Sequence, residues 1–386
     1  MTALRAVHLQ RRPRVRPWQL VAVPVASIAA GLAVGAVFLT LTGHDPTMVY
    51  PAMLSAAFTT WFGFTDTLAS ATPLIGTGLA AAVAFRFGLY NIGAEGQLYA
   101  GAIAASGVAL ALGEAVPAPA AVTALLLAGV AGGMLWIAVP AAARAWLGTS
   151  EIITTLLLNY VALYWMRYLI FGSTSFWRDP TSTNFPQGKP IPASAELAEL
   201  GLTRVHLGLG VAVLAAVLVT LVLNRTRLGF HLRVYGDSEA AASYAGINVR
   251  RLVLAVLLAS GALAGLAGAG EIGGRAHALD PQGLALGLGY AGIIVAALAR
   301  YNPLAVVLVA VLLGGVRNAG TALQSLPGGR VPIAISTMLE GAILLFTLGG
   351  ELFIRYRLRF GRGQGAATAE DLESVPVASP AEPTTR

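Results

Sequence analysis

Five polar residues stand within segments that are otherwise apolar, and their chemistry needs an explanation. Asn91, Glu95 and Gln97 fall at the start of one apolar run, while Asn159 and Glu340 lie near the middle of two others. Amides and carboxylates are costly in lipid unless they face a cavity, a solute or a partner. The pattern therefore makes these five residues candidates for lining the path of a transported molecule.

Each candidate also has an interpretation in which it serves packing. Glu95 can neutralise the positive end of a helix dipole, and Asn91, Gln97 and Asn159 can bond to neighbouring helices. The carboxyl group of Glu340 can be protonated or paired with a basic side chain. Sequence alone leaves both interpretations open.

Motifs for catalysis and cofactor binding are missing. The chain has no cysteine, no His-Glu-x-x-His metal motif and no Gly-x-Ser-x-Gly turn. Its single lysine, Lys189, stands in Gly-Lys-Pro, so the phosphate loop that holds ATP is absent. Residues 287–292 read GLGYAG, but an apolar run surrounds them and no strand precedes them, which argues against a dinucleotide site. We expect no enzyme activity, no metal and no cofactor in this chain.

Composition places the chain in a membrane. Of its 386 residues, 56% are hydrophobic and 11% are charged, whereas soluble domains carry about 25% charged residues. We predict an all-α multi-pass membrane protein with about ten transmembrane helices. The expected spans cover residues 18–41, 67–85, 91–112, a stretch ending near 138, then 150–171, 205–223, 252–270, 284–299, 303–316 and 331–348.

Basic residues set the predicted orientation. The net charge of +7 comes from arginines that gather in the N-terminal segment 1–17, in the loop 224–251 and in the tail 351–386. Cytoplasmic segments carry such an excess, so we place both termini inside and expect no binding of nucleic acid. The transmembrane domain then covers 18–350, with an outer loop at 172–204. The end of the tail should be disordered, because it is rich in Ala, Pro, Glu, Ser and Thr.

Two pairs of glycines at i, i+4 spacing predict close helix packing. They are Gly31 with Gly35 and Gly261 with Gly265. Small residues let two backbones approach each other in lipid, where no hydrophobic force drives helices together.

A short polar segment, GDSEAAASYAGINVRR at 236–251, separates two apolar runs. We expect Asp237 to cap a helix of about two turns, Glu239 to suit its first turn and Gly246 to end it in the left-handed conformation. A helix this short is marginal alone. Its candidate contact face consists of Ala241, Tyr244, Ala245 and Asn248, and we interpret the segment as a docking element for a cytoplasmic partner. The alternative is a solvated loop helix without contacts.

Several segments resemble one family. FGLYNIGAEGQ resembles the F-N-I-G-x-E-G-Q signature of ABC-transporter permeases in the sugar, branched-chain amino acid and nucleoside group, with Tyr90 in place of Phe. The segment 151–160 and the loop 184–208 resemble those of nucleoside-type permeases. The Glu-Ala-Ala sequence at 239–241, followed by Gly246, is similar to the permease coupling loop, with one more residue before the glycine.

The resemblance covers residues 67–348 and implies a permease subunit of a bacterial plasma-membrane importer. It implies three protein partners, namely an ABC ATPase subunit, a second permease in a homo- or heterodimer, and an extracellular substrate-binding lipoprotein. ATP would be used by the partner ATPase. The outer loop 172–204 is a candidate landing surface for the lipoprotein, or merely a cover for the outer vestibule. The residues implied in ATPase coupling are Gly236, Glu239, Ala240, Ala241, Tyr244 and Gly246.

The resemblance favours nucleosides as the small-molecule substrate, and a simple sugar such as ribose is the second candidate. Tyr90, Tyr160 and Trp165 are able to stack on a base. A gradient-driven secondary transporter is the alternative from another class. It would need intramembrane carboxylates, for which Glu95 and Glu340 are the candidates.

Overall fold

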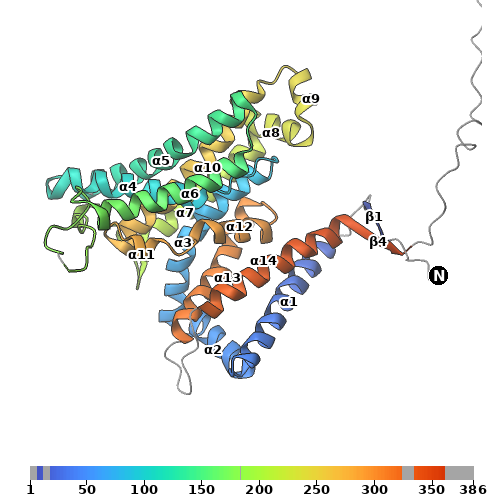
Figure 1. The fold of residues 1–386 in the computed structure, drawn as a ribbon, viewed down its shortest axis with the longest axis horizontal. Coiled ribbons are helices and arrows are strands. Elements are labelled where there is room, and N and C mark those ends of the chain that lie inside the picture. Colours follow the sequence, from blue (N-terminus) through green and yellow to red (C-terminus); the bar gives the residue numbers. More distant parts are fainter. Residues whose placement is uncertain (1–6, 12–17, 183, 324–333, 361–386) are drawn as a thin grey trace, which may run out of the picture.

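The computed structural model describes residues 7–11, 18–182, 184–323 and 334–360, and it is built almost entirely of helices (Figure 1). The N-terminal half contains α1 Gln19–Leu41, α2 Pro46–Phe58, α3 Trp61–Phe85, α4 Ala94–Leu112, α5 Ala118–Ala142 and α6 Glu151–Arg167. The C-terminal half contains α7 Leu207–Arg225, α8 Arg227–Asp237, α9 Glu239–Tyr244, α10 Val249–Glu271, α11 Pro281–Leu284, α12 Leu288–Leu298, α13 Pro303–Ala322 and α14 Ala334–Arg355.

Short elements complete the chain. They are the paired strands β1 Val7–Arg11 and β4 Tyr356–Phe360, the paired strands β2 Glu199–Leu202 and β3 Val205–His206, the π-helical turns η2 Ala143–Leu147, η3 Tyr168–Gly172 and η5 Ile272–Ala276, and the 3₁₀ turns η1 Gly113–Ala115 and η4 Ala193–Ala195.

Eight of the described helical segments are long and apolar enough to cross a membrane, and two further apolar stretches, Val25–Leu41 and Thr337–Thr347, are shorter. The helical, multi-pass architecture is therefore confirmed, whereas the count of ten spans stays a prediction. One crossing is broken. The segment Pro281–Leu298 joins α11 to α12 through non-helical residues, and α12 alone has 11 residues, about 16 Å of helix against the roughly 30 Å of a bilayer core.

Helices α3 and α10 form the centre of the bundle, where small residues allow close contact. In α3, 89% of the most apolar stretch is buried. A Cβ atom at Gly133 of α5 would collide with the backbone of Gly261 in α10, and one at Gly265 would collide with Gly129. The predicted packing role of the glycine pair in α10 is confirmed.

Helices α1 and α14 pack along each other and lie on the opposite side of the bundle from α4 and α5 (Figure 1). The Cβ position of Gly31 meets Ile343, and that of Gly35 meets Leu339, which confirms the second predicted packing pair. Strands β1 and β4 continue this pair of helices as an antiparallel ribbon, with Val7 opposite Phe360. The two ends of the described chain therefore lie together.

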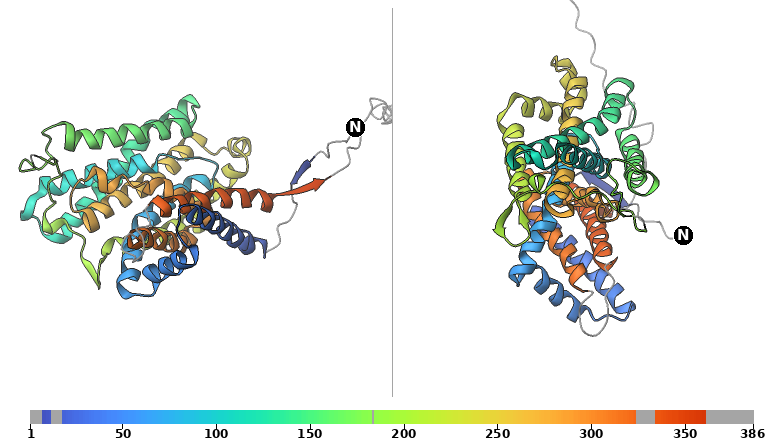
Figure 2. Two further views of the ribbon diagram at one scale, coloured as in Figure 1. Left: turned by 60° about the horizontal axis from the view of Figure 1, so that its bottom comes forward. Right: turned by 90° about the vertical axis from the view of Figure 1, so that its left-hand side faces the viewer.

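The molecule has two distinct ends. Helices α8 and α9 and the β1–β4 ribbon lie toward one end, and the segment between η3 and α7 lies toward the other (Figures 1 and 2). This arrangement agrees with a coupling loop and both termini on one side of the membrane. Which end faces the cytoplasm stays a prediction.

Several predicted boundaries are wrong. The span expected to start at residue 67 begins earlier, because α3 already starts at Trp61, with Thr60 capping it by accepting from the backbone N–H of Gly63, and α2 occupies part of the residues before it. Asp66 is therefore inside a helix. Helix α13 continues past residue 316 and contains Arg317, and α14 continues to Arg355. The expected ends at residues 67 and 316 fall next to Asp66 and Arg317, because hydropathy places helix ends at charged residues. The predictions for residues 1–6, 12–17, 324–333 and the end of the tail lie outside the described residues.

Candidate transport and coupling sites

Asn91 and Gln97 form a closed pair in the core. The side chain of Asn91 donates to Gln97 Oε1 at 2.9 Å, and Gln97 Nε2 donates back to Asn91 Oδ1 at 2.9 Å. Asn91 also donates to Ser260 Oγ of α10 and accepts from the N–H of Gly93. Both side chains are fully buried. The pair ties the start of α4 to α10.

Glu95 binds the N-terminus of α12, the second half of the broken crossing. Its carboxylate accepts from the backbone N–H of Gly287 at 3.1 Å, from the N–H of Gly289 and from the hydroxyl of Tyr99. Free N–H groups at a helix N-terminus attract negative charge, so Glu95 of α4 acts as the cap of α12. This contact explains the second glycine of the GLGYAG segment, since a Cβ at Gly289 would collide with the backbone of Glu95.

Asn159 joins three segments. Its Oδ1 accepts from the N–H of Gly96, and its Nδ2 donates to the carbonyl of Ile92 and to the hydroxyl of Tyr290, at 2.9 and 3.1 Å. The structure thus brings Asn91, Glu95, Gln97 and Asn159 to one end of α4. The hydrogen bonds described for these four side chains are all made to other groups of the protein. Whether these residues also contact a solute stays a prediction.

Glu340 is paired, as one of the interpretations of its sequence position required. Arg317 Nε donates to Glu340 Oε1 at 2.7 Å and Arg317 Nη2 donates to Oε2 at 3.1 Å, which forms a bidentate bridge between α13 and α14. A buried carboxylate is retained at low cost only with such a partner. Sequence reasoning missed Arg317 because it placed this residue in an outer loop.

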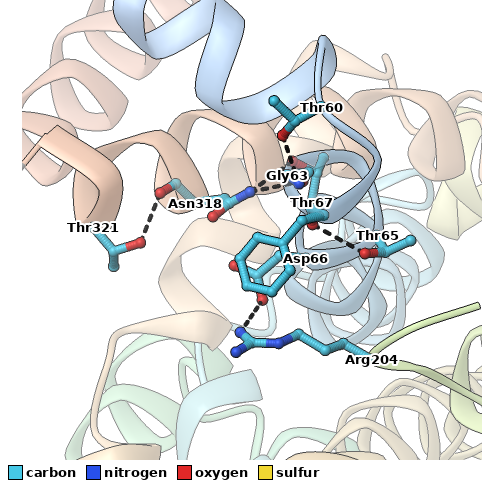
Figure 3. A network of polar contacts seen from close by, with 9 residues as sticks. Thr60, Gly63, Thr65, Asp66, Thr67, Arg204, Asn318 and Thr321 are labelled. Carbon is cyan, nitrogen blue, oxygen red and sulfur yellow. Dashed lines mark hydrogen bonds and ion pairs between the residues drawn. The ribbon is translucent and has the colours of Figure 1, made fainter. Parts of the chain in front are cut away.

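A polar cavity lies beside this pair, between α3, η5, α12, α13 and α14. It encloses about 130 Å³ and its lining includes Asp66, Ser70, Arg275, Arg317 and Asn318. Figure 3 shows part of its frame: Asn318 donates to the carbonyl of Gly63 and to Thr67 Oγ1, while Arg204 pairs with Asp66 at 3.1 Å. Glu340 lies next to the cavity, and the other four predicted path residues do not line it.

The predicted docking helix is present as α9. Its cap is Ser238, whose hydroxyl accepts from the N–H of Ala241 at 3.2 Å, and not Asp237, which ends α8 instead. Serine and aspartate cap equally well, so sequence could not decide between neighbours. Gly246 follows α9 with a φ of +75° in open space, the left-handed conformation that was predicted.

Helix α9 rests on the bundle through Ala242, which is fully buried. The face predicted for docking points the other way. Ala241, Ala245 and Asn248 are exposed, and Tyr244 is 98% exposed. An aromatic side chain that is this exposed beside a supported helix is available to a partner.

A chain of polar contacts leads from the α8–α9 segment into the bundle. Arg144 of η2 interacts electrostatically with Tyr235 in α8 and lies 3.3 Å from Glu151 Oε2 of α6. Glu151 Oε1 accepts from the backbone N–H of Tyr90 at 3.1 Å, and Thr155 accepts from the N–H of Ile92 at 3.2 Å. We name Tyr235, Arg144, Glu151 and Tyr90 the inner relay. Sequence reasoning overlooked it because its members are far apart in the chain.

Apolar contacts support the inner relay. Tyr235, Leu232 and Ala242 from α8 and α9 are buried in one cluster with Phe87, from the turn between α3 and α4, and with Leu257 of α10. Burial raises the pKa of Tyr235, so its hydroxyl stays neutral at physiological pH. Helices α8 and α9 are therefore packed in one cluster with α3, α10 and the turn that precedes α4.

The comparisons with known proteins decide the family. A family model described as branched-chain amino acid transport system / permease component matches residues 63–348. The chain belongs to this family of ABC-transporter permeases. The permease is 37% identical over 351 residues to the guanosine ABC transporter permease protein NupP of Bacillus subtilis, with 89% of this chain and 95% of the relative covered.

Two further relatives differ in their named substrates. The permease is 36% identical to the glucose ABC transporter permease protein TsgB13 of Haloferax volcanii, over 91% of this chain and 94% of the relative. It is 30% identical to the nucleoside ABC transporter permease protein NupB of Lactococcus lactis, over 84% and 90%. No solved structure matches significantly. The permease is a multi-pass membrane protein and a transport subunit, as predicted.

His206 is a buried histidine at the end of the molecule that lies away from α8 and α9. His206 precedes α7, and its Nδ1 accepts from the N–H of Gly208 at 3.2 Å, while its Nε2 has no partner among the described residues. Burial, reinforced by His277 and Arg275, lowers the pKa of His206 to about 4. The imidazole is therefore neutral at physiological pH. Among the described residues, no cluster of His, Asp and Glu suitable for a metal ion is present.

Proposed function

We propose that this permease forms the membrane path of an ATP-driven nucleoside importer, and that the driving motion enters through α9. The observation that carries the proposal is the combination of an exposed docking face around Tyr244 with the inner relay behind it. A partner that pushes on α9 would move Tyr235 and Arg144, and Glu151 would transmit the motion to the first residues of α4.

The docking segment comprises Gly236, Glu239, Ala240, Ala241, Tyr244 and Gly246. In this proposal a separate ABC ATPase subunit binds it and consumes ATP, and this chain has no nucleotide site of its own. A second permease and an extracellular binding lipoprotein complete the importer. The path runs past Asn91, Glu95, Gln97, Asn159 and Glu340, whose mutual bonds would exchange between the outward and inward states.

Nucleosides are the first candidate because two relatives of high coverage are named as guanosine and nucleoside permeases. A simple sugar is the second candidate, since a relative of similar identity is named as a glucose permease. A third possibility, a gradient-driven carrier, has little support from Glu340, because a carboxylate held by Arg317 is not free to bind a driving ion.

Reconstituted transport tests the proposal. The permease is assembled in proteoliposomes with the ATPase, second permease and lipoprotein of the proposed importer, and uptake of labelled adenosine is followed with and without ATP. We expect ATP-dependent uptake that guanosine competes and ribose does not. Competition by ribose alone would favour the sugar candidate. Uptake by the permease without the ATPase, driven by a proton or sodium gradient, would overturn the proposal.

A further inference from the structure

The polar cavity beside Arg317 has the properties of a binding site for a hydroxylated solute. It opens among α3, η5, α12, α13 and α14, and its polar lining consists of Asp66, Ser70, Arg275, Arg317, Asn318, Thr321 and Thr337. A cavity with convergent polar groups from several helices is the usual form of a small-molecule site. Within a membrane domain such groups are costly unless they serve a solute or one another.

Several polar atoms of the cavity lining have no hydrogen-bond partner among the described residues. Asn318 is buried and its Nδ2 is fixed by Gly63 and Thr67, but its Oδ1 accepts nothing from a described residue (Figure 3). Ser70 lines the cavity, and its hydroxyl bonds to no described residue. Neither oxygen is among the fully enclosed unpaired atoms of the described residues, so both are accessible from the cavity to a ligand or to water.

Two charged residues of the cavity lining are held in ion pairs. Asp66 is bound to Arg204 through Oδ1, and Arg317 is bound to Glu340 through Nε and Nη2. These pairs leave Asp66 Oδ2 as an acceptor and Arg317 Nη1 as a donor. Arg275 adds further donors to the lining, and it has no ion pair among the described residues.

The geometry points to a site for the hydroxyl groups of a sugar ring, the ribose of a nucleoside or a free monosaccharide, and not for a base. Each hydroxyl donates and accepts at once, and the cavity offers both kinds of group in close proximity. None of the lining residues is aromatic, so a base would find no surface on which to stack. This inference rests on the proposed import of nucleosides or sugars and adds the recognised part of the substrate.

The site is tested by combining substitutions in the cavity lining with substrates that lack one hydroxyl group. Ser70→Ala, Asp66→Asn and Thr321→Val each remove one group from the lining while conserving volume. In the reconstituted importer, we expect at least one variant to raise the KM for adenosine by about threefold to tenfold, the effect of one lost hydrogen bond. The same variant should have less effect on 2′-deoxyadenosine or 3′-deoxyadenosine, because the paired hydroxyl is already missing.

The matched control is Ser106→Ala in α4, a buried serine outside the cavity whose hydroxyl bonds within its own helix. It should leave all three KM values unchanged. The lipoprotein contributes equally to every permease variant, so its preference cancels in the ratio. If uptake is normal but the three lining variants change nothing, or change adenosine and both analogues by the same factor, the site is overturned. If the wild type shows no ATP-dependent uptake, the proposed function itself fails.

Discussion

Arg144 Nε lies 3.3 Å from Glu151 Oε2, and this pair is where the α8–α9 segment meets the transmembrane helices. Arg144 interacts electrostatically with Tyr235 of α8 on one side, and Glu151 accepts a hydrogen bond from the N–H of Tyr90 on the other. The pair is partly exposed, so its contribution to stability is modest, about 1 kcal/mol or less. Its importance in the proposed importer lies in connection rather than in stability.

The inner relay predicts uncoupling variants. Arg144→Ala should reduce ATP-dependent uptake about tenfold while the assembled ATPase continues to hydrolyse ATP, because motion of α8 no longer reaches Glu151. The ratio of solute moved to ATP hydrolysed measures this effect. Arg250→Ala is the matched control and should keep the ratio, because this exposed arginine of the segment 236–251 is neither in the inner relay nor among the implied coupling residues. An Arg144→Ala variant with normal uptake would mean that the relay transmits nothing.

The conformation of Gly246 predicts a difference between two substitutions. At a φ of +75°, a β-branched residue is strained by about 1–2 kcal/mol, whereas asparagine tolerates the left-handed region. Gly246→Val should therefore displace the end of α9 and lower coupled uptake, and Gly246→Asn should be close to the wild type. Uptake and membrane abundance are measured together. Equal behaviour of the two variants would contradict the assigned role of this turn.

Tyr244 should matter for assembly and not for folding. Because its side chain is 98% exposed, Tyr244→Ala should change the thermal unfolding midpoint of the purified permease very little. In the proposed importer, the Tyr244→Ala substitution should reduce the amount of ATPase that co-purifies with the permease severalfold. Tyr164→Ala, on an exposed face of α6, serves as the control for general loss of an aromatic side chain. Unaltered ATPase binding in the Tyr244 variant would place the docking surface elsewhere.

Glu95 should be essential for the broken helix α12. Glu95→Ala leaves the N–H groups of Gly287 and Gly289 without an acceptor, at a cost of about 1–3 kcal/mol each. Glu95→Gln keeps an acceptor oxygen and should cost less. Thermal unfolding in detergent compares them. The control is Glu114→Ala, which removes one exposed bond to the N–H of Ala193. A Glu95→Ala protein as stable as the control would show that α12 needs no cap.

The buried His206 predicts that the stability of the folded protein falls when the pH is lowered. Its pKa is lowered from an ordinary 6.5 to about 4 in the folded protein, so the unfolded chain binds the proton first as the pH falls. The contribution is present in full above pH 6.5 and is lost between 6.5 and 4, at about 1.4 kcal/mol per pH unit. Unfolding of the wild type at pH 7.5 and 5.0 measures it. His206→Asn should lose less stability on acidification, and His44→Gln, a partly exposed control, should lose as much as the wild type.

Sequence by itself determined the class of the molecule, because an apolar composition and positive clusters are requirements of the bilayer and can be read locally. It also identified the small-residue packing faces, the left-handed glycine and the family signature. These features depend on residues close together in the chain. Helix ends were less well predicted where a charge falls inside a helix, as at Asp66 and Arg317.

Tertiary structure decided what each polar residue bonds to. Arg204 neutralises Asp66 from a segment 138 positions away, and Glu95 caps a helix that begins 193 positions later. The local pattern of the sequence does not predict such pairs. A buried charge is tolerated only when the fold brings an opposite charge or hydrogen-bond partner to it, and these partners are distant in the sequence. The same holds for the inner relay and for the polar cavity, since both exist only where separate helices meet.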